Sequence, residues 1–78
     1  MIPTIENYLK EYKKAIKYID TTIDNKFVFI ALKPYLHTKD IFSIIEKMKN
    51  ERYDYQEIEF DPFLNDITIW FNIPKKSF

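Results

Sequence analysis

Glycine and cysteine are absent from this 78-residue chain, and histidine occurs once. Without cysteine the chain cannot form a disulfide framework, a thiolate zinc site, an iron–sulfur cluster or a cysteine nucleophile. Without glycine it cannot form a phosphate-binding P-loop or the glycine-rich dinucleotide-binding turn, because both need backbone that a Cβ would block. Nucleotide enzymes of these types and thiol enzymes are therefore excluded.

The missing glycine also has a structural consequence. Every position that needs a positive φ must hold a residue with a Cβ, and Asn and Asp tolerate this conformation best. The candidates for such positions are Asn25, Asn50 and Asn65. Eleven of the twelve cations are Lys, and Ala and Arg are scarce, as an AT-rich gene would produce. This compositional resemblance would suit a viral or mobile-element accessory protein.

Charge and hydropathy limit the partners and the compartment. The formal net charge is zero, so no overall field favours nucleic acid or an anionic membrane. The N-terminal residues lack the basic and apolar regions of a secretory signal, and no apolar run approaches the roughly 20 residues of a membrane span. We expect a cytoplasmic protein without membrane contact, built as a single domain over residues 1–78.

Two segments have the apolar spacing of amphipathic helices. In residues 3–19 the apolar positions are Ile5, Tyr8, Leu9, Tyr12, Ala15, Ile16 and Ile19. The opposite face of this predicted helix carries a lysine stripe of Lys10, Lys13, Lys14 and Lys17. A second helix is predicted to end at Asn50, with Thr38 or Asp40 as its N-cap. Its buried stripe is Ile41, Ile44, Ile45 and Met48, widened by Phe42.

Three segments have the patterns of strands. Residues 27–32 are apolar throughout, whereas residues 55–60 and 67–73 alternate and are joined by a turn-rich connection, which predicts a β-hairpin. The expected fold is α+β in the order α-β-α-β-β, with a three-stranded sheet and both helices packed on one face. We expect the strand order 1-3-2, with mixed pairing unless the second helix reverses the direction of the chain. A meander with the second strand central is the alternative.

Alternation in the hairpin predicts an exposed aromatic and acidic surface. Four apolar residues of the last strand need a core on one side: Ile67, Ile69, Phe71 and Ile73. The residues predicted on the opposite face are Thr68, Trp70 and Asn72, joined from the neighbouring strand by Tyr55, Glu57 and Glu59. The first strand adds either Phe27, Phe29 and Ala31 or Val28, Ile30 and Leu32.

The six hairpin residues of this face predict a protein-binding site. Trp and Tyr most often anchor protein interfaces, and carboxylates at the rim select a basic partner. We expect a small non-enzymatic accessory or inhibitor-type module that binds another protein, including a second copy of itself as a homodimer. The alternative is that Trp70 is covered by Phe78 or by the Phe63–Leu64 loop, or stands as an isolated exposed aromatic residue.

Nucleic acid is the second candidate partner. Aromatic rings on a sheet can stack single-stranded bases, and the lysine stripe of the first helix could bind phosphates. Glu57 and Glu59 beside Trp70 would repel phosphates, however, so this hypothesis ranks below protein binding.

Catalytic and metal-binding patterns are weak. His37 is the only imidazole and precedes a helix start, where a turn or capping role is more common than catalysis. The only serines are Ser43 and Ser77. Asp61, Asp66, Glu57 and Glu59 could supply oxygen ligands, but the two glutamates lie about 7 Å apart along a strand and the two aspartates suit turns. We therefore expect no enzyme activity, no cofactor and no metal.

Overall fold

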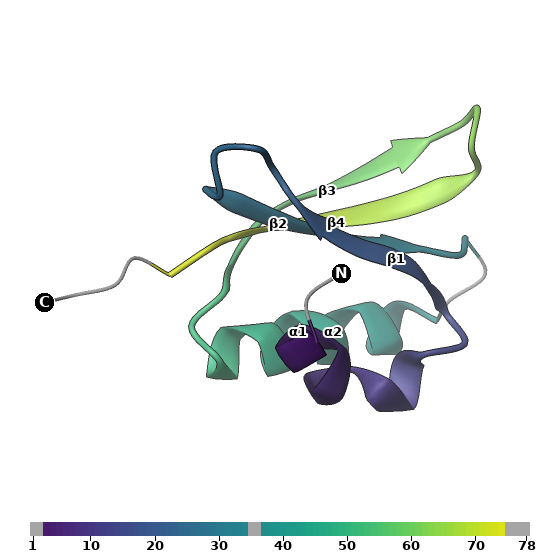
Figure 1. Cartoon of the computed structure of the whole chain (residues 1–78). Helices are drawn as coiled ribbons and strands as arrows, with labels where there is room; N and C mark the ends of the chain where they lie inside the picture. The colour runs from purple at the N-terminus through teal and green to yellow at the C-terminus, as the bar shows by residue number, and fades with distance from the viewer. Residues whose placement is uncertain (1–2, 35–36, 75–78) are drawn as a thin grey trace, which may run out of the picture.

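A computed structural model shows a four-stranded antiparallel sheet with helices against one of its faces (Figure 1). The structure describes residues 3–34 and 37–74. The elements in chain order are α1 (Pro3–Tyr8), the 3-10 helix η1 (Lys10–Tyr12), β1 (Ile16–Thr21), β2 (Phe27–Leu32), α2 (Thr38–Asn50), β3 (Asp54–Asp61) and β4 (Asp66–Asn72). The strands lie in the order β1-β2-β4-β3.

The predicted fold class is wrong in its first helix and in its number of strands. The helix expected over residues 3–19 ends at Tyr8, and after the short η1 the chain continues as strand β1. The sheet therefore has four strands instead of three, and α2 is the one main helix in the part of the chain that is described.

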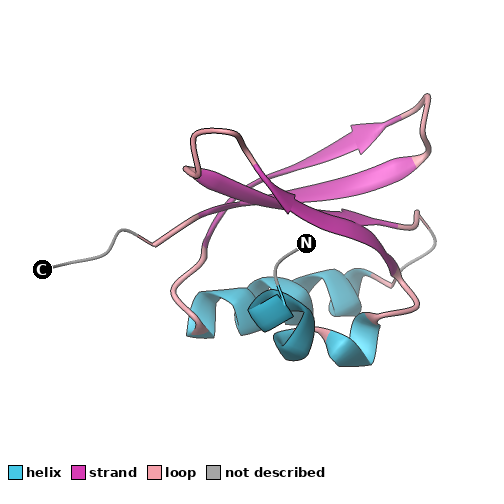
Figure 2. Ribbon diagram, viewed as in Figure 1, coloured by secondary structure: helices cyan, strands magenta, loops and turns pink. Residues whose placement is uncertain are grey.

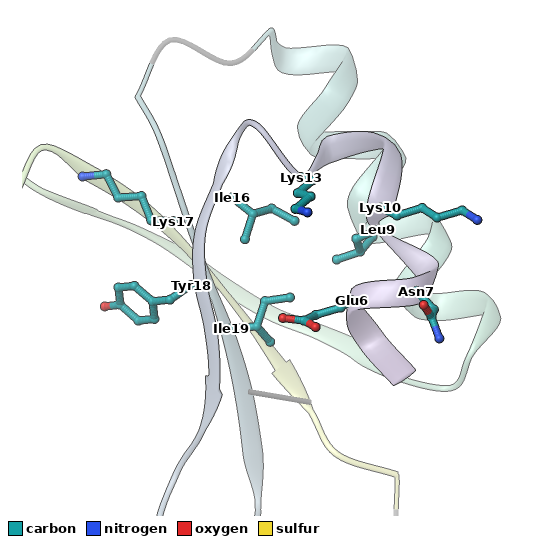
Figure 3. A pocket seen from close by; sticks show the side chains of 9 residues that line it. All are labelled: Glu6, Asn7, Leu9, Lys10, Lys13, Ile16, Lys17, Tyr18 and Ile19. Atoms are coloured by element: carbon teal, nitrogen blue, oxygen red, sulfur yellow. The ribbon is translucent and has the colours of Figure 1, made fainter. Parts of the chain in front are cut away.

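A β-bulge explains why β1 has the spacing of a helix. Ile16 and Tyr18 pair with consecutive residues of β2, so Lys17 between them is an extra residue. The insertion puts Ile16 and Ile19 on the same face, whereas a regular strand would place residues three apart on opposite faces. Figure 3 shows these two isoleucines directed toward α1 and η1, with Lys17 and Tyr18 directed away. An i,i+3 apolar pair therefore arises from a bulged strand.

The remaining elements lie close to their predicted positions. Strand β2 spans the predicted residues, and β3 and β4 form the predicted hairpin. Strand β4 lies between β2 and β3, which agrees with the expected order of these three strands. Their pairing is antiparallel throughout and not mixed, because α2 returns the chain so that β3 runs parallel to β2 while β4 between them runs the opposite way.

The hydrophobic core lies between the helices and the facing side of the sheet, which we call the inner face. The fully buried core residues are Ile5 and Leu9, Val28, Ile30 and Leu32, Ile44 and Met48, and Ile69 and Phe71. Ile41 and Ile45 of the predicted α2 stripe pack partly buried against them. Phe42 was expected to widen this stripe, but its position on the helix leaves it exposed. An ion pair between Lys47 and Glu11, 2.6 Å apart, joins α2 to η1 and raises the pKa of Lys47 above its ordinary value.

Helix α2 begins and ends differently from the predicted caps. Its N-cap is His37, whose side chain makes no capping hydrogen bond, and the predicted caps Thr38 and Asp40 lie inside the helix. At the C-terminus Tyr53 N–H donates to Met48 C=O and Arg52 N–H donates to Lys49 C=O, both at 2.9 Å. These two bonds make a Schellman motif, which places Arg52 where helices usually have glycine.

Three residues of the described segments have positive φ: Asn25 at 57°, Arg52 at 69° and Asn65 at 56°. The predictions for Asn25 and Asn65 are confirmed. The prediction for Asn50 is wrong because Asn50 is the last residue of α2, and the left-handed position comes two residues later. A residue with a Cβ pays about 1–2 kcal/mol in this conformation, and Arg lacks the local hydrogen bonding that helps Asn.

Substituting Arg52→Gly is therefore expected to stabilise the fold. The gain in the free energy of unfolding should be about 0.5–1 kcal/mol, because relief of the left-handed strain is partly offset by the greater freedom of glycine in the unfolded chain. Urea denaturation measures the change. Arg52→Ala is the matched control, since it removes the charge but keeps the Cβ; equal stability of the two variants would contradict the assignment of strain.

Candidate functional site

The face of the sheet that points away from the helices, here called the outer face, has no helix over it in the described part of the chain (Figure 2). Strand register determines its members. They are Tyr18 and Asp20 of β1, Phe27, Phe29 and Ala31 of β2, Asp66, Thr68, Trp70 and Asn72 of β4, and Asp54, Glu57, Glu59 and Asp61 of β3. Of the two alternatives left open for the first predicted strand, Phe27, Phe29 and Ala31 therefore lie on this face.

One row of side chains crosses the outer face from edge to edge. Asp20 lies opposite Phe29, Phe29 opposite Trp70, and Trp70 opposite Glu57. The rings of Phe29 and Trp70 are 4.8 Å apart between centroids and tilted by 39°. Tyr18 meets Phe29 edge-on at 6.0 Å. An aromatic centre thus has a carboxylate on each side.

The aromatic side chains of the row are only partly covered. Phe29 and Trp70 are half-buried, and Tyr18 is exposed. The indole Nε1 of Trp70 is buried and has no hydrogen-bond partner among the described residues. A buried N–H group without a hydrogen-bond partner costs about 1–3 kcal/mol of stability. No hydrogen bond within the described residues offsets this cost for the indole of Trp70.

The remaining predicted residues of this face frame the aromatic centre. Glu57 and Glu59 are exposed, and Thr68 and Asn72 are half-buried beside Trp70. Asn72 Nδ2 donates a hydrogen bond to Gln56 Oε1 at 2.9 Å. The structure thus brings Trp70, Glu57, Glu59, Thr68 and Asn72 together on one surface.

Tyr55 does not lie on the outer face, where strict alternation had placed it. A second bulge, between Tyr55 and Glu57, inserts Gln56 and turns Tyr55 toward the inner face, opposite Phe71. The aromatic residues that join Trp70 are instead Phe29 and Tyr18. Tyr18 was missed because its segment has the apolar spacing of a helix, and the β-branched and aromatic content of residues 16–21 is the signal that could have identified a strand.

The predicted lysine stripe does not form. Lys10 belongs to η1, Lys13 and Lys14 follow it, and Lys17 lies in β1. Figure 3 shows the side chains of Lys10 and Lys17 pointing to opposite sides. A groove of about 490 Å³ between α1–η1 and β1 is lined by apolar residues that include Leu9 and by polar residues that include Lys10, Lys13 and Lys17.

Lys17 instead makes an ion pair on the outer face. Its Nζ reaches past β2 to the carboxylate of Asp66 at the start of β4, and it also donates to Leu64 C=O at 3.3 Å. Asp66 is the one buried charged residue of the described segments. The pair joins β1 to the end of the β3–β4 hairpin and neutralises the charge of Lys17.

The other residues considered for chemistry have local structural contacts. Asp61 Oδ1 accepts hydrogen bonds from the backbone N–H groups of Phe63 and Leu64 in the hairpin turn. No group of three carboxylate or histidine side chains within residues 3–34 and 37–74 is placed to hold a metal ion. Phe63 is 96% exposed and so covers nothing, while Ser77 and Phe78 lie outside the described residues.

Comparison with known proteins gives no relative. No protein-family model, no curated protein and no solved structure matches this chain. Among the helices that the structure describes, none is both long and apolar enough to cross a membrane.

Removing the cation of the outer-face ion pair should destabilise the protein. Lys17→Met leaves the buried carboxylate of Asp66 without its partner, and we expect a loss of about 1–3 kcal/mol in the free energy of unfolding. The value is below that of a fully buried pair because the Lys17 side chain is 34% exposed. Urea denaturation followed by Trp70 fluorescence measures it.

Lys14→Met serves as the control for this measurement. Lys14 is exposed and precedes β1, so its loss should change stability by less than about 0.5 kcal/mol. Equal effects of the two substitutions would show that the ion pair contributes nothing.

Proposed function

We propose that this chain is a non-enzymatic protein-binding module of the accessory or inhibitor type, and that its outer face holds the partner. The observation that carries the proposal is the row Asp20, Phe29, Trp70 and Glu57, in which two tilted rings 4.8 Å apart at the centre of the sheet face stand between carboxylates. Central aromatic anchors with a polar rim are the usual arrangement of a protein interface.

The charges of the outer face favour a basic partner. Glu57 and Glu59 lie along one edge of the face and Asp20 along the other, and all three are exposed. Lys17, the basic residue of β1, is engaged by Asp66. Rim carboxylates accelerate encounter with a basic surface and disfavour an acidic one.

The same charges disfavour two other partners. A second copy docked face to face would bring its own rim of carboxylates against this one, so we propose a different protein rather than a homodimer. Single-stranded nucleic acid could stack on Phe29 and Trp70, but its phosphates would meet Glu57 and Glu59.

The test compares capture of partners from native cell extract by the wild-type protein and by Trp70→Ala. Loss of a central anchor should weaken binding by about 30-fold or more, as at an interface hot spot. Glu57→Lys is a second variant, chosen because the side chain is exposed and its loss spares the core. It should reduce capture and the salt dependence of capture.

The matched control is Phe63→Ala, which removes an exposed aromatic ring away from the outer face. If Trp70→Ala and Glu57→Lys capture as much partner as Phe63→Ala does, the proposal is contradicted. Trp70 is the only tryptophan, so quenching of its fluorescence by short oligonucleotides, reversed by salt, would favour nucleic acid instead.

A further inference from the structure

Strand β3 is an edge strand that the other residues described by the structure leave open. It pairs with β4 on one side only, and every residue from Asp54 to Phe60 is exposed. Figure 1 shows the hairpin end of β3 and β4 standing clear of the helix layer. An open edge presents a row of backbone N–H and C=O groups that can pair with another strand.

The two sides of β3 differ in chemistry beyond the bulge at Gln56. Glu57 and Glu59 point to the outer face, opposite Trp70 and Thr68 of β4. Ile58 and Phe60 point to the inner face, where the helices do not cover them, and they are 41% and 60% exposed. The edge therefore offers carboxylates on one side and apolar side chains on the other, in strict alternation.

We propose that residues 57–61 of β3 bind an extended segment of the partner in which basic and apolar residues alternate, by addition of that segment to the edge of the sheet. Its basic side chains lie opposite Glu57 and Glu59, and its apolar side chains cover Ile58 and Phe60. The inference rests on the proposed function, because the same two glutamates form the rim of the outer face. Strand addition supplies backbone hydrogen bonds, and the alternating side chains supply the selectivity.

Charge excludes a second copy of β3 as the occupant. Two copies of this strand paired antiparallel about Ile58 would place Glu57 of one opposite Glu59 of the other. Like charges directly opposite each other destabilise a strand pair, whereas opposite charges stabilise it. The bulge at Gln56 further restricts regular pairing to the part of β3 that follows it.

The experiment adds a synthetic peptide, acetyl-Lys-Val-Lys-Val-Lys-Val-amide, to the full chain. Binding is followed by NMR of the backbone amides and by their hydrogen exchange. We expect exchange to slow by about tenfold or more within residues 57–61, since new strand pairing protects amides. No change at these amides under saturating peptide would overturn the inference.

Peptide controls separate strand pairing from simple charge attraction. A block peptide of the same composition, with three Lys followed by three Val, has the same charge but cannot place all its lysines on one face of the strand and all its valines on the other. A peptide with Glu in place of Lys should bind about tenfold more weakly. If the block peptide protects residues 57–61 as well as the alternating one, the inference fails.

Variants of the protein complete the test. The double substitution Glu57→Lys and Glu59→Lys should reverse the preference toward the Glu peptide, and Ile58→Lys should weaken binding of the Lys peptide. Phe63→Lys, on an equally apolar but fully exposed turn residue, should leave it unchanged. An unaltered preference in the double variant, or protection of β3 by self-association without peptide, would overturn the inference.

The outcomes also distinguish this inference from the proposed function. Trp70→Ala should leave peptide addition intact while reducing capture of the partner. If the peptide does not bind β3 but capture of the partner still depends on Trp70, strand addition is rejected and the proposed function stands. If the peptide binds β3 but capture of the partner does not depend on Trp70, the outer face is rejected as the partner site.

Discussion

The packing of one layer of helices against one face of a four-stranded sheet determines the rest of this structure. Two short helical turns and α2 bury the inner sides of β2 and β4 around Ile30, Ile69 and Phe71. A layer of this size cannot also cover the inner side of β3, so Ile58 and Phe60 stay exposed. No helix of the described residues lies over the outer face. The exposed surfaces of the molecule thus follow from how little helix the chain contains.

Two β-bulges account for the main differences between prediction and structure. In β1 the bulge at Lys17 gives Ile16 and Ile19 the spacing of a helix, and in β3 the bulge at Gln56 turns Tyr55 away from the outer face. Both bulges lie on edge strands, where irregular pairing protects against uncontrolled association. Hydrophobic periodicity assumes a regular element, so it cannot detect an inserted residue. The segments without a bulge, β2, β4 and α2, lie close to their predicted positions.

The candidate site was predictable where it depends on regular alternation alone. The alternation in β4 and the second half of β3 located Trp70, Glu57 and Glu59 on one face. In β2 the pattern does not show which face is the outer one, because all six residues are apolar. Phe29 lies on the outer face because α2 packs against the other side of the strand. Likewise, composition predicted Asn25 and Asn65 as left-handed residues, but Arg52 depends on where α2 ends. These features arise from tertiary contacts and not from local sequence.

The strand order has a consequence for how the chain folds. Strands β1 and β2, and β3 and β4, are hairpins between neighbours in sequence, and both can form by local contacts. The central pairing of β2 with β4 instead joins Phe27 to Asn72 and closes a loop that contains α2 and all of β3. Contacts between residues so distant in sequence cost more loop-closure entropy and slow folding. The ion pair of Lys17 with Asp66 links these same two hairpins, so its energy becomes available only after they dock. It should therefore slow unfolding more than it accelerates folding.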